Sequence, residues 1–162
     1  DQAIPGQVGL EHRVGGLGKN EEGGVSYDPN NHEEMTRLRA DKVNAIANSL
    51  PPSEVFGDAE GGDVLVLGWG GTYGAITSAV RNLRTEGFPV SSLHLRNLNP
   101  FPNDLGDILS KFKQVLIPEL NMGQLSLLIR SKYLIDVISY SKVQGQPFKV
   151  SELSNKILET IR

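Results

Sequence analysis

The residues that could carry chemistry in this chain lie in four segments, each of which follows a short apolar run. The segments are 68–74, 96–103, 118–124 and 139–148, and they are rich in Gly, Pro, Asn and Gln. If the apolar runs are parallel strands, all four segments leave the same edge of a sheet, where α/β proteins place their functional loops. Their composition suits recognition through hydrogen bonds, because general acids and bases are few.

Seven side chains in these segments are the candidates for a functional surface. We expect an intersubunit or interdomain interface, since rigidly held loops carry recognition and amide side chains can satisfy a partner without burying a charge. The alternative is that these side chains cap helices and tie turns within the domain, and the sequence leaves both open. The seven are Arg96, Asn99, Glu119, Asn121, Gln124, Gln144 and Gln146.

Catalysis by this chain has little support in the sequence. Glu119 stands at a strand end without a second carboxylate or a histidine near it, whereas acid–base catalysis needs a positioned partner. The three histidines, at positions 12, 32 and 94, are scattered, and the absence of cysteine excludes thiolate-held zinc, an iron–sulfur cluster and a cysteine nucleophile. We therefore assign no catalytic residue, no cofactor-binding residue and no metal ligand.

The segment Gly68–Gly74 invites comparison with a dinucleotide-binding loop. A GxGxxG motif counted from Gly68 needs glycine where Tyr73 stands, and no Lys-Ser/Thr pair follows as in a P-loop. The glycines are better explained by a sharp turn and a helix packed closely on the sheet. A stand-alone Rossmann-like module that binds a nucleotide or another small ligand is the alternative function.

The elements that must position these loops follow from the hydrophobic pattern. Apolar runs predict strands near 63–68, 90–95, 114–118 and 135–140, and helical periodicity lies between them. Such alternation predicts an α/β fold, a three-layer αβα sandwich with a mainly parallel sheet. Within it, Phe112 is expected to end a helix that Asn103 or Asp104 opens, and Ser151 to cap the last helix.

Charge and composition divide the chain near residue 62. Residues 1–62 hold 5 Lys and Arg against 11 Asp and Glu, a net of −6, and residues 63–162 hold 11 against 8, a net of +3. We expect an acidic, glycine-rich arm with a helix and linker over 1–62 and an α/β domain over 63–162. The helix should begin at Asn31, present Met35, Leu38 and Val43 on one face, and stop at Pro51-Pro52.

Composition also narrows the class of partner and the location. No basic stretch with interleaved aromatic residues indicates nucleic acid, and no apolar run approaches the roughly 20 residues of a membrane span. We expect a cytoplasmic protein. The chain opens Asp1-Gln2-Ala3 without methionine, and we expect it to be part of a longer polypeptide.

Several strings of the sequence together resemble a known family. Ser26-Tyr27-Asp28-Pro29 resembles the segment that joins the pyrimidine-binding domain to the following domain in alpha subunits of 2-oxoacid:ferredoxin oxidoreductases. The later strings resemble that following, transketolase C-terminal-like domain, in the 2-oxoglutarate variety more than the pyruvate one. They are Gly68-Trp69-Gly70, Leu98-Asn99-Pro100-Phe101-Pro102, Pro118-Glu119-Leu120-Asn121-Met122-Gly123-Gln124-Leu125 and Lys142-Val143-Gln144-Gly145-Gln146-Pro147-Phe148. The stretch Gly15–Gly24 is longer than the usual arm.

The resemblance implies a thiamine diphosphate enzyme with Mg and an iron–sulfur cluster. Such an enzyme oxidatively decarboxylates a 2-oxoacid to an acyl-CoA and passes the electrons to ferredoxin. This chain lacks the expected Gly-Asp-Gly signature of the diphosphate–Mg site and has no cysteine, so it is expected to be inactive alone. The resemblance implies a non-catalytic domain that supports assembly with the beta subunit and the preceding pyrimidine-binding domain, around a cofactor bound elsewhere.

Overall fold

The structure, a computed structural model, describes residues 3–12 and 14–161. The chain forms two compact units, Asp1–Ile46 and Ala47–Arg162. The boundary between residues 62 and 63 that charge and composition suggest stays a prediction about domain organisation.

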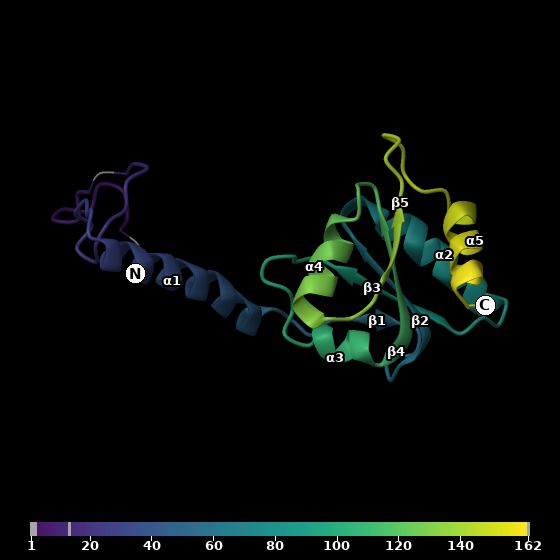
Figure 1. Cartoon of the computed structure of the whole chain (residues 1–162). Helices are drawn as coiled ribbons and strands as arrows, with labels where there is room; N and C mark the ends of the chain where they lie inside the picture. The colour runs from purple at the N-terminus through teal and green to yellow at the C-terminus, as the bar shows by residue number, and fades with distance from the viewer. Residues whose placement is uncertain (1–2, 13, 162) are drawn as a thin grey trace. The chain divides into compact units, whose positions relative to one another are not determined.

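The first unit consists of an arm and one long helix, α1 (Pro29–Ala45), labelled in Figure 1. The 3-10 turn η1 (Ile46–Ser49) follows in the chain and has all but its first residue in the second unit. In the described part of the arm the only strand pairing is an isolated antiparallel bridge between Lys19 and Val25. The helix begins two residues earlier than predicted because Asp28 caps it, accepting hydrogen bonds from the backbone N–H groups of Asn30 (2.7 Å) and Asn31 (3.0 Å). Asn31, the predicted first residue, lies inside the helix, and its side chain donates to the carbonyl of Lys19.

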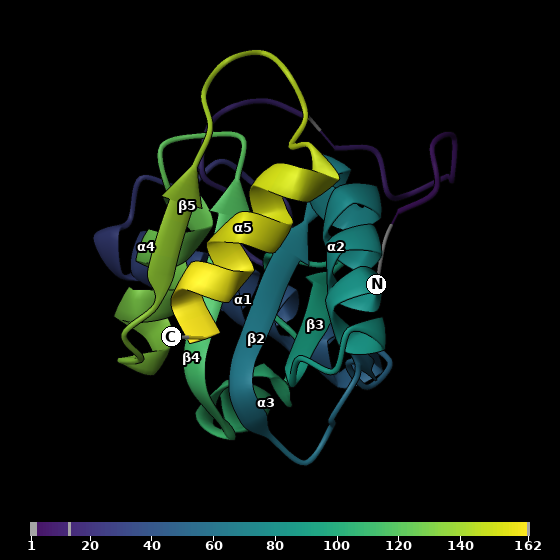
Figure 2. The same ribbon diagram turned by 90° about the vertical axis from the view of Figure 1, so that its right-hand side faces the viewer.

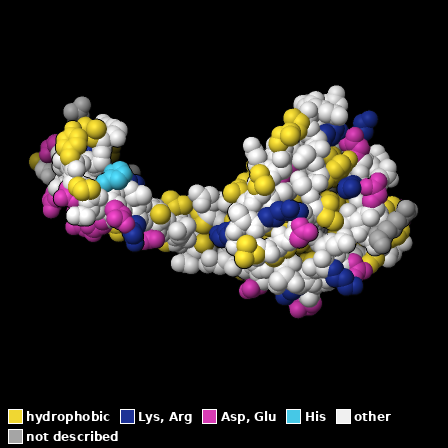
Figure 3. All heavy atoms as spheres, in the orientation of Figure 1, with side chains coloured by type: hydrophobic (Ala, Val, Ile, Leu, Met, Phe, Trp, Pro, Cys, Tyr) yellow, Lys and Arg dark blue, Asp and Glu magenta, His cyan; other side chains and the backbone are white. Residues whose placement is uncertain are grey.

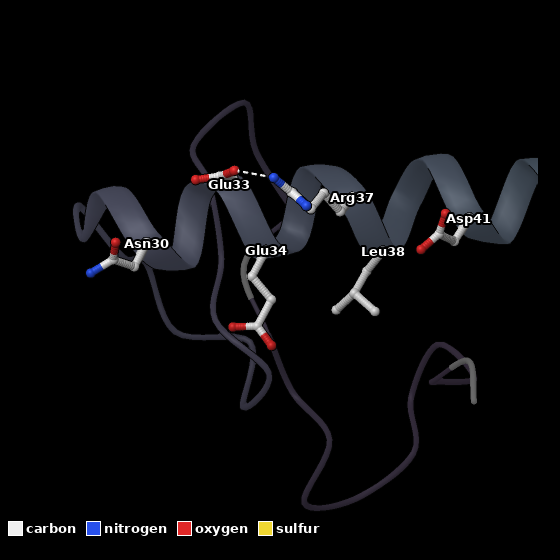
Figure 4. A pocket seen from close by; sticks show the side chains of 6 residues that line it. All are labelled: Asn30, Glu33, Glu34, Arg37, Leu38 and Asp41. Carbon is white, nitrogen blue, oxygen red and sulfur yellow. Dashed lines mark hydrogen bonds and ion pairs between the residues drawn. The ribbon is translucent and has the colours of Figure 1, made fainter.

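None of the seventeen residues of α1, all of them described, is buried. The predicted apolar face exists in sequence, but Leu38 is 46% exposed, and Met35 and Val43 are only half-buried. An open hollow of about 290 Å³ lies along α1, and Figure 4 shows the six side chains around it, with an ion pair between Glu33 and Arg37. Surface pairs of this kind contribute little stability.

The second unit is built on a five-stranded sheet with the order β1-β3-β2-β4-β5. All neighbouring pairs are parallel except β1 with β3, so the sheet is mainly parallel, as predicted. The strands are β1 (Val55–Phe56), β2 (Gly62–Trp69), β3 (Val90–Leu95), β4 (Phe112–Glu119) and β5 (Ile138–Ser141). The helices are η2 (Gly70–Thr72), α2 (Tyr73–Thr85), α3 (Leu105–Ser110), α4 (Gln124–Tyr133) and α5 (Val150–Ile161).

Helices cover both faces of this sheet, as the αβα prediction requires. Figure 2 shows α2 and α5 over the face turned to the viewer, where Val66 and Leu116 of the sheet pack with Ile157 of α5. On the other face, Leu65 and Ile117 pack with α3 and α4. Both clusters consist of side chains that are almost wholly buried. The two cores hold the strand ends, and hence the loops, in fixed positions.

In the second unit, three boundaries of helices or strands differ from those that the sequence predicts. Phe112 begins β4 instead of ending a helix, because α3 stops at Ser110. The last strand starts at Ile138, three residues later than predicted, although Val137 before it is buried. Ser151 lies inside α5, and the N–H of Lys149 before that helix is bound by the carboxylate of Glu152.

Candidate functional site

Glu119 is the last residue of β4 and lies at the edge formed by the carboxyl ends of the parallel strands. Its side chain is 0% exposed and accepts five hydrogen bonds. Oε1 accepts from Trp69 Nε1 (3.3 Å), Asn121 Nδ2 (3.1 Å) and the N–H of Leu125 (2.8 Å). Oε2 accepts from the N–H and the hydroxyl of Ser126, at 3.1 and 3.0 Å. Five donors fill the acceptor sites of one carboxylate.

This carboxylate also occupies the N-terminus of α4. Leu125 and Ser126 are in the first turn of that helix, whose N–H groups have no partner inside the helix and attract negative charge. An anion from outside would have to displace Glu119 to reach them. With its acceptor sites filled, Glu119 is poorly placed to act as a general base, and it ties β2, β4 and α4 together.

Asn121 makes the turn between β4 and α4. Its Oδ1 accepts from the N–H groups of Gly123 (2.8 Å) and Gln124 (3.0 Å), while its Nδ2 donates to Glu119. Gly123 has φ +85°, and a Cβ there would lie 2.9 Å from the hydroxyl oxygen of Ser139. The amide of Asn121 is thus used within the domain, whereas the side chain of Gln124 is exposed.

Close packing, which was predicted for the glycines of 68–74, is found at Gly68 near the end of β2. A Cβ on Gly68 would come 2.4 Å from Cδ1 of Ile76, so a side chain there would force the Ile76 side chain of α2 to move. The Thr72 hydroxyl closes the turn by donating to the carbonyl of Trp69 (2.8 Å) and accepting from its N–H (3.2 Å). Gly68 is thus explained by close packing and Gly70 by its φ of +56°, whereas a Cβ on Gly71 or Gly74 would meet open space.

The loop between β5 and α5 rises beyond the strand ends (Figure 2) and is anchored at its base. Lys142 is 8% exposed, and its ammonium group donates to both carboxylate oxygens of Glu152, at 3.0 and 2.8 Å, and to the carbonyl of Pro147 (3.1 Å). The hydrogen bond from Lys142 is the main cause that lowers the pKa of Glu152. The tip above this anchor presents Gln144 and Gln146 to solvent.

Arg96 and Asn99 follow β3, which is separated from β5 by β2 and β4 in the strand order. Both residues are exposed. Arg96 lines a cleft of about 740 Å³ together with His94, Tyr73 and Arg81. Burial is the main cause that lowers the pKa of His94; the Arg96 guanidinium lowers it further, and the backbone of Gly70 opposes both. The seven candidates therefore follow the carboxyl ends of parallel strands, but Arg96 and Asn99 stand apart from the β4 and β5 loops.

Exposed apolar side chains on the β4 and β5 loops were missed by sequence reasoning. Met122 is 80% exposed, Val143 60% and Leu120 39%. They stand on loops that follow neighbouring strands, and Figure 3 shows hydrophobic side chains near the projecting loop and over α4. Apolar residues between the polar ones in 118–124 and 142–148 were the available signal, since apolar side chains gathered at one edge mark interaction surfaces.

No group of three or more His, Cys, Asp or Glu side chains within 3–12 and 14–161 is placed to hold a metal ion. In the same residues no helix is long and apolar enough to cross a membrane. The chemistry that this edge can perform is hydrogen bonding and apolar contact.

Comparison with known proteins identifies the family. Residues 62–153 match the family model described as pyruvate:ferredoxin oxidoreductase core domain II. The chain belongs to this family. The match begins at β2 and ends inside α5, so it includes the Glu119 network and all seven candidates.

Two relatives of this core domain II chain cover almost its whole length. It is 47% identical, over 96% of its length, to the 2-oxoglutarate oxidoreductase subunit KorA of Mycobacterium tuberculosis, and it covers 24% of that protein. A solved 2-oxoglutarate:ferredoxin oxidoreductase from Magnetococcus marinus, with 2-oxoglutarate, coenzyme A and succinyl-CoA bound, matches 99% of the chain with a TM-score of 0.90 and 34% identity. The chain covers 28% of that structure's chain, so it spans about a quarter of either relative.

The predicted fold family is confirmed. A split-gene transketolase matches 68% of the chain, and the chain covers 41% of it, with a TM-score of 0.53; at 14% identity this match shows the fold alone. The resemblance to alpha subunits of 2-oxoacid:ferredoxin oxidoreductases is likewise confirmed by the family model and the KorA relative. The interface role of the seven candidates stays a prediction.

Proposed function

We propose that this core domain II chain is a non-catalytic part of the alpha subunit of a thiamine diphosphate-dependent 2-oxoglutarate:ferredoxin oxidoreductase. Residues 1–62 are its arm, helix and linker, and residues 63–162 its transketolase C-terminal-like domain. The whole enzyme oxidatively decarboxylates a 2-oxoacid to an acyl-CoA and transfers electrons to ferredoxin. Its relatives' names support this reaction, and the chain's role in it is assembly with the beta subunit and the preceding pyrimidine-binding domain.

The observation that carries the non-catalytic role is the closed network around Glu119. It is the one carboxylate in the four candidate loops that is buried at a strand end, and its acceptor sites are filled by Trp69, Asn121, Leu125 and Ser126. The chain's residues also do not fit the cofactors of the enzyme: it has no cysteine for a cluster, and α4's N-terminal N–H groups are bound by its own carboxylate. Thiamine diphosphate, Mg and the cluster belong to other parts of the enzyme.

The assembly role is supported by what the same edge exposes. Met122, Val143 and Leu120 offer apolar surface in the segments after β4 and β5, and Gln124, Gln144 and Gln146 in the same two segments expose amides. An apolar centre with a polar rim is the usual anatomy of a protein interface. Glu119 and Asn121, which are satisfied internally, contribute to this surface by fixing its loops.

The test replaces apolar surface by charge in the full-length subunit coexpressed with its beta subunit. Met122→Asp with Val143→Asp should weaken assembly at least about tenfold, because a carboxylate would have to be desolvated in the contact. Leu134→Asp is the matched control, since Leu134 is 88% exposed and follows the other end of α4. Copurification and gel filtration report the effect. Unchanged assembly of the double variant contradicts the assembly role.

A further inference from the structure

The cleft beside β3 is a second surface, away from the β4 and β5 loops. It is formed by the segment that leads into β1, the exposed side of α2 and the end of β3. Its volume, about 740 Å³, is large enough for several side chains of a partner. Apolar walls come from Pro51, Pro52, Phe56 and Tyr73, and the last two are 42% and 57% exposed.

Two arginines give this cleft its charge. Arg81 of α2 and Arg96 after β3 line it, and neither makes an ion pair with any carboxylate in the described residues. Arg37, Arg84 and Arg130, in contrast, each pair with a carboxylate. Arg81 instead lies over the Phe56 ring, 6.0 Å from its centroid. Glu54 is the one acidic residue in the lining, so the cleft carries more positive than negative charge.

The mixed lining of the cleft favours a polypeptide over a small molecule as occupant. A polypeptide segment can offer carboxylates to Arg81 and Arg96 and an apolar side chain to Phe56 and Tyr73 at the same time. A small anion would use the arginines alone.

We propose that this cleft binds an acidic segment of the partner subunit, with carboxylates at Arg81 and Arg96 and an apolar side chain against Phe56 and Tyr73. Guanidinium groups recognise carboxylates through paired hydrogen bonds, and aromatic residues are frequent anchors of interfaces. This inference rests on the proposed function for its partner. It adds a contact that is distinct from the apolar loops and uses charge.

The experiment places a photo-crosslinking benzoylphenylalanine at Thr77, which lines the cleft, in the full-length subunit assembled with its partner. The cross-link should map to a partner segment with two or more Asp or Glu residues beside an apolar one. Thr85→benzoylphenylalanine is the control, because Thr85 is an exposed residue on the same helix outside the cleft. It should give no such product.

Charge variants complete the test. Arg81→Glu with Arg96→Glu should lower the cross-link yield roughly tenfold, and the double lysine variant should keep most of it, since the loss follows charge reversal. A cross-link to a neutral segment, to another part of the subunit or to a second copy overturns the inference, as does no cross-link. Loss of the cross-link on adding millimolar succinate to an intact complex indicates a small-anion pocket and overturns it too. If the subunits still assemble in any of these outcomes, the inferred contact in the cleft is wrong, and the proposed assembly function is not contradicted.

Discussion

The two units of this chain differ in where their apolar side chains go. In Ala47–Arg162 they form two cores, one on each face of a five-stranded sheet. In Asp1–Ile46 the helix α1 buries none of its residues, and Val8, Val14 and Tyr27 of the arm are 85% exposed or more. A helix of this kind gains little from packing, which is the main source of helix stability in proteins. The first unit therefore has no apolar core among its described residues.

A core substitution in the second unit should have the largest effect. Leu116 of β4 is 0% exposed, and Leu116→Ala should lower the free energy of unfolding by about 2–5 kcal/mol through lost contacts and a cavity. Urea denaturation of the chain measures it. A loss below about 1 kcal/mol would mean that this core is looser than the structure indicates.

The Glu119 network should come next. Glu119→Gln places an amide N–H₂ group against at least one buried donor, and we expect a loss of about 1–3 kcal/mol in the free energy of unfolding. Trp69→Phe removes one donor and leaves the carboxylate, so its loss should be smaller. Equal stability of wild type and Glu119→Gln would show that the carboxylate is not needed to hold β4 and α4 together.

The pH dependence of the melting temperature should report the Lys142–Glu152 pair at the base of the loop between β5 and α5. The hydrogen bond from Lys142 lowers the folded-state pKa of Glu152 below its usual 4.5, so this pair stabilises the fold above that pH. The stabilisation is lost as pH falls from about 4.5 through the lower folded pKa. Lys142→Met should reduce the fall in melting temperature between pH 6 and about pH 3.

Arg84 lowers the pKa of Asp58 in the same direction, so part of the acid sensitivity remains in the Lys142 variant. Arg84→Met with Lys142→Met should flatten the profile further. Parallel profiles for wild type and Lys142→Met would rule out the anchoring role of the pair.

The smallest effect is expected in α1. Leu38→Ala should change the unfolding free energy of this chain by less than about 0.5 kcal/mol, because Leu38 is 46% exposed and packs in no core. In the full-length assembled enzyme the same substitution should lower the melting temperature, if α1 packs on other parts there. Differential scanning calorimetry of both proteins makes the comparison. A large loss in the chain itself would show that α1 is stabilised from within.

Local sequence patterns predicted most strands of the second unit well, but they did not predict which residues pair or pack together. The apolar runs at 63–68 and 90–95 gave β2 and β3 nearly to the residue, because buried parallel strands are continuous in sequence. The two residues of β1 were too few to leave a signal. Phe112 fitted the helical period as well as the strand, and only its pairing with Gly62 decides between them.

The site shows the same limit. That Glu119 stands at a strand end was visible, but its bond to Trp69 spans fifty residues of sequence and depends on β2 lying beside β4. Asn121 was predicted at an interface, and the alternative weighed with it, a residue that ties a turn, matches its hydrogen bonds to Gly123 and Gln124. Exposure of Met122 and Val143 likewise follows from tertiary structure.

The central claim, that this chain supports the enzyme without taking part in its chemistry, is tested most directly by single-turnover decarboxylation in the assembled enzyme. The full-length subunit with Glu119→Gln would be purified as an intact complex loaded with thiamine diphosphate, with Trp69→Phe as its control. The account predicts a rate constant within about threefold of wild type for both variants, because neither side chain touches reacting atoms. A loss of about a hundredfold or more in Glu119→Gln alone, in a complex of unchanged composition and stability, would identify Glu119 as an acid–base catalyst and contradict the claim.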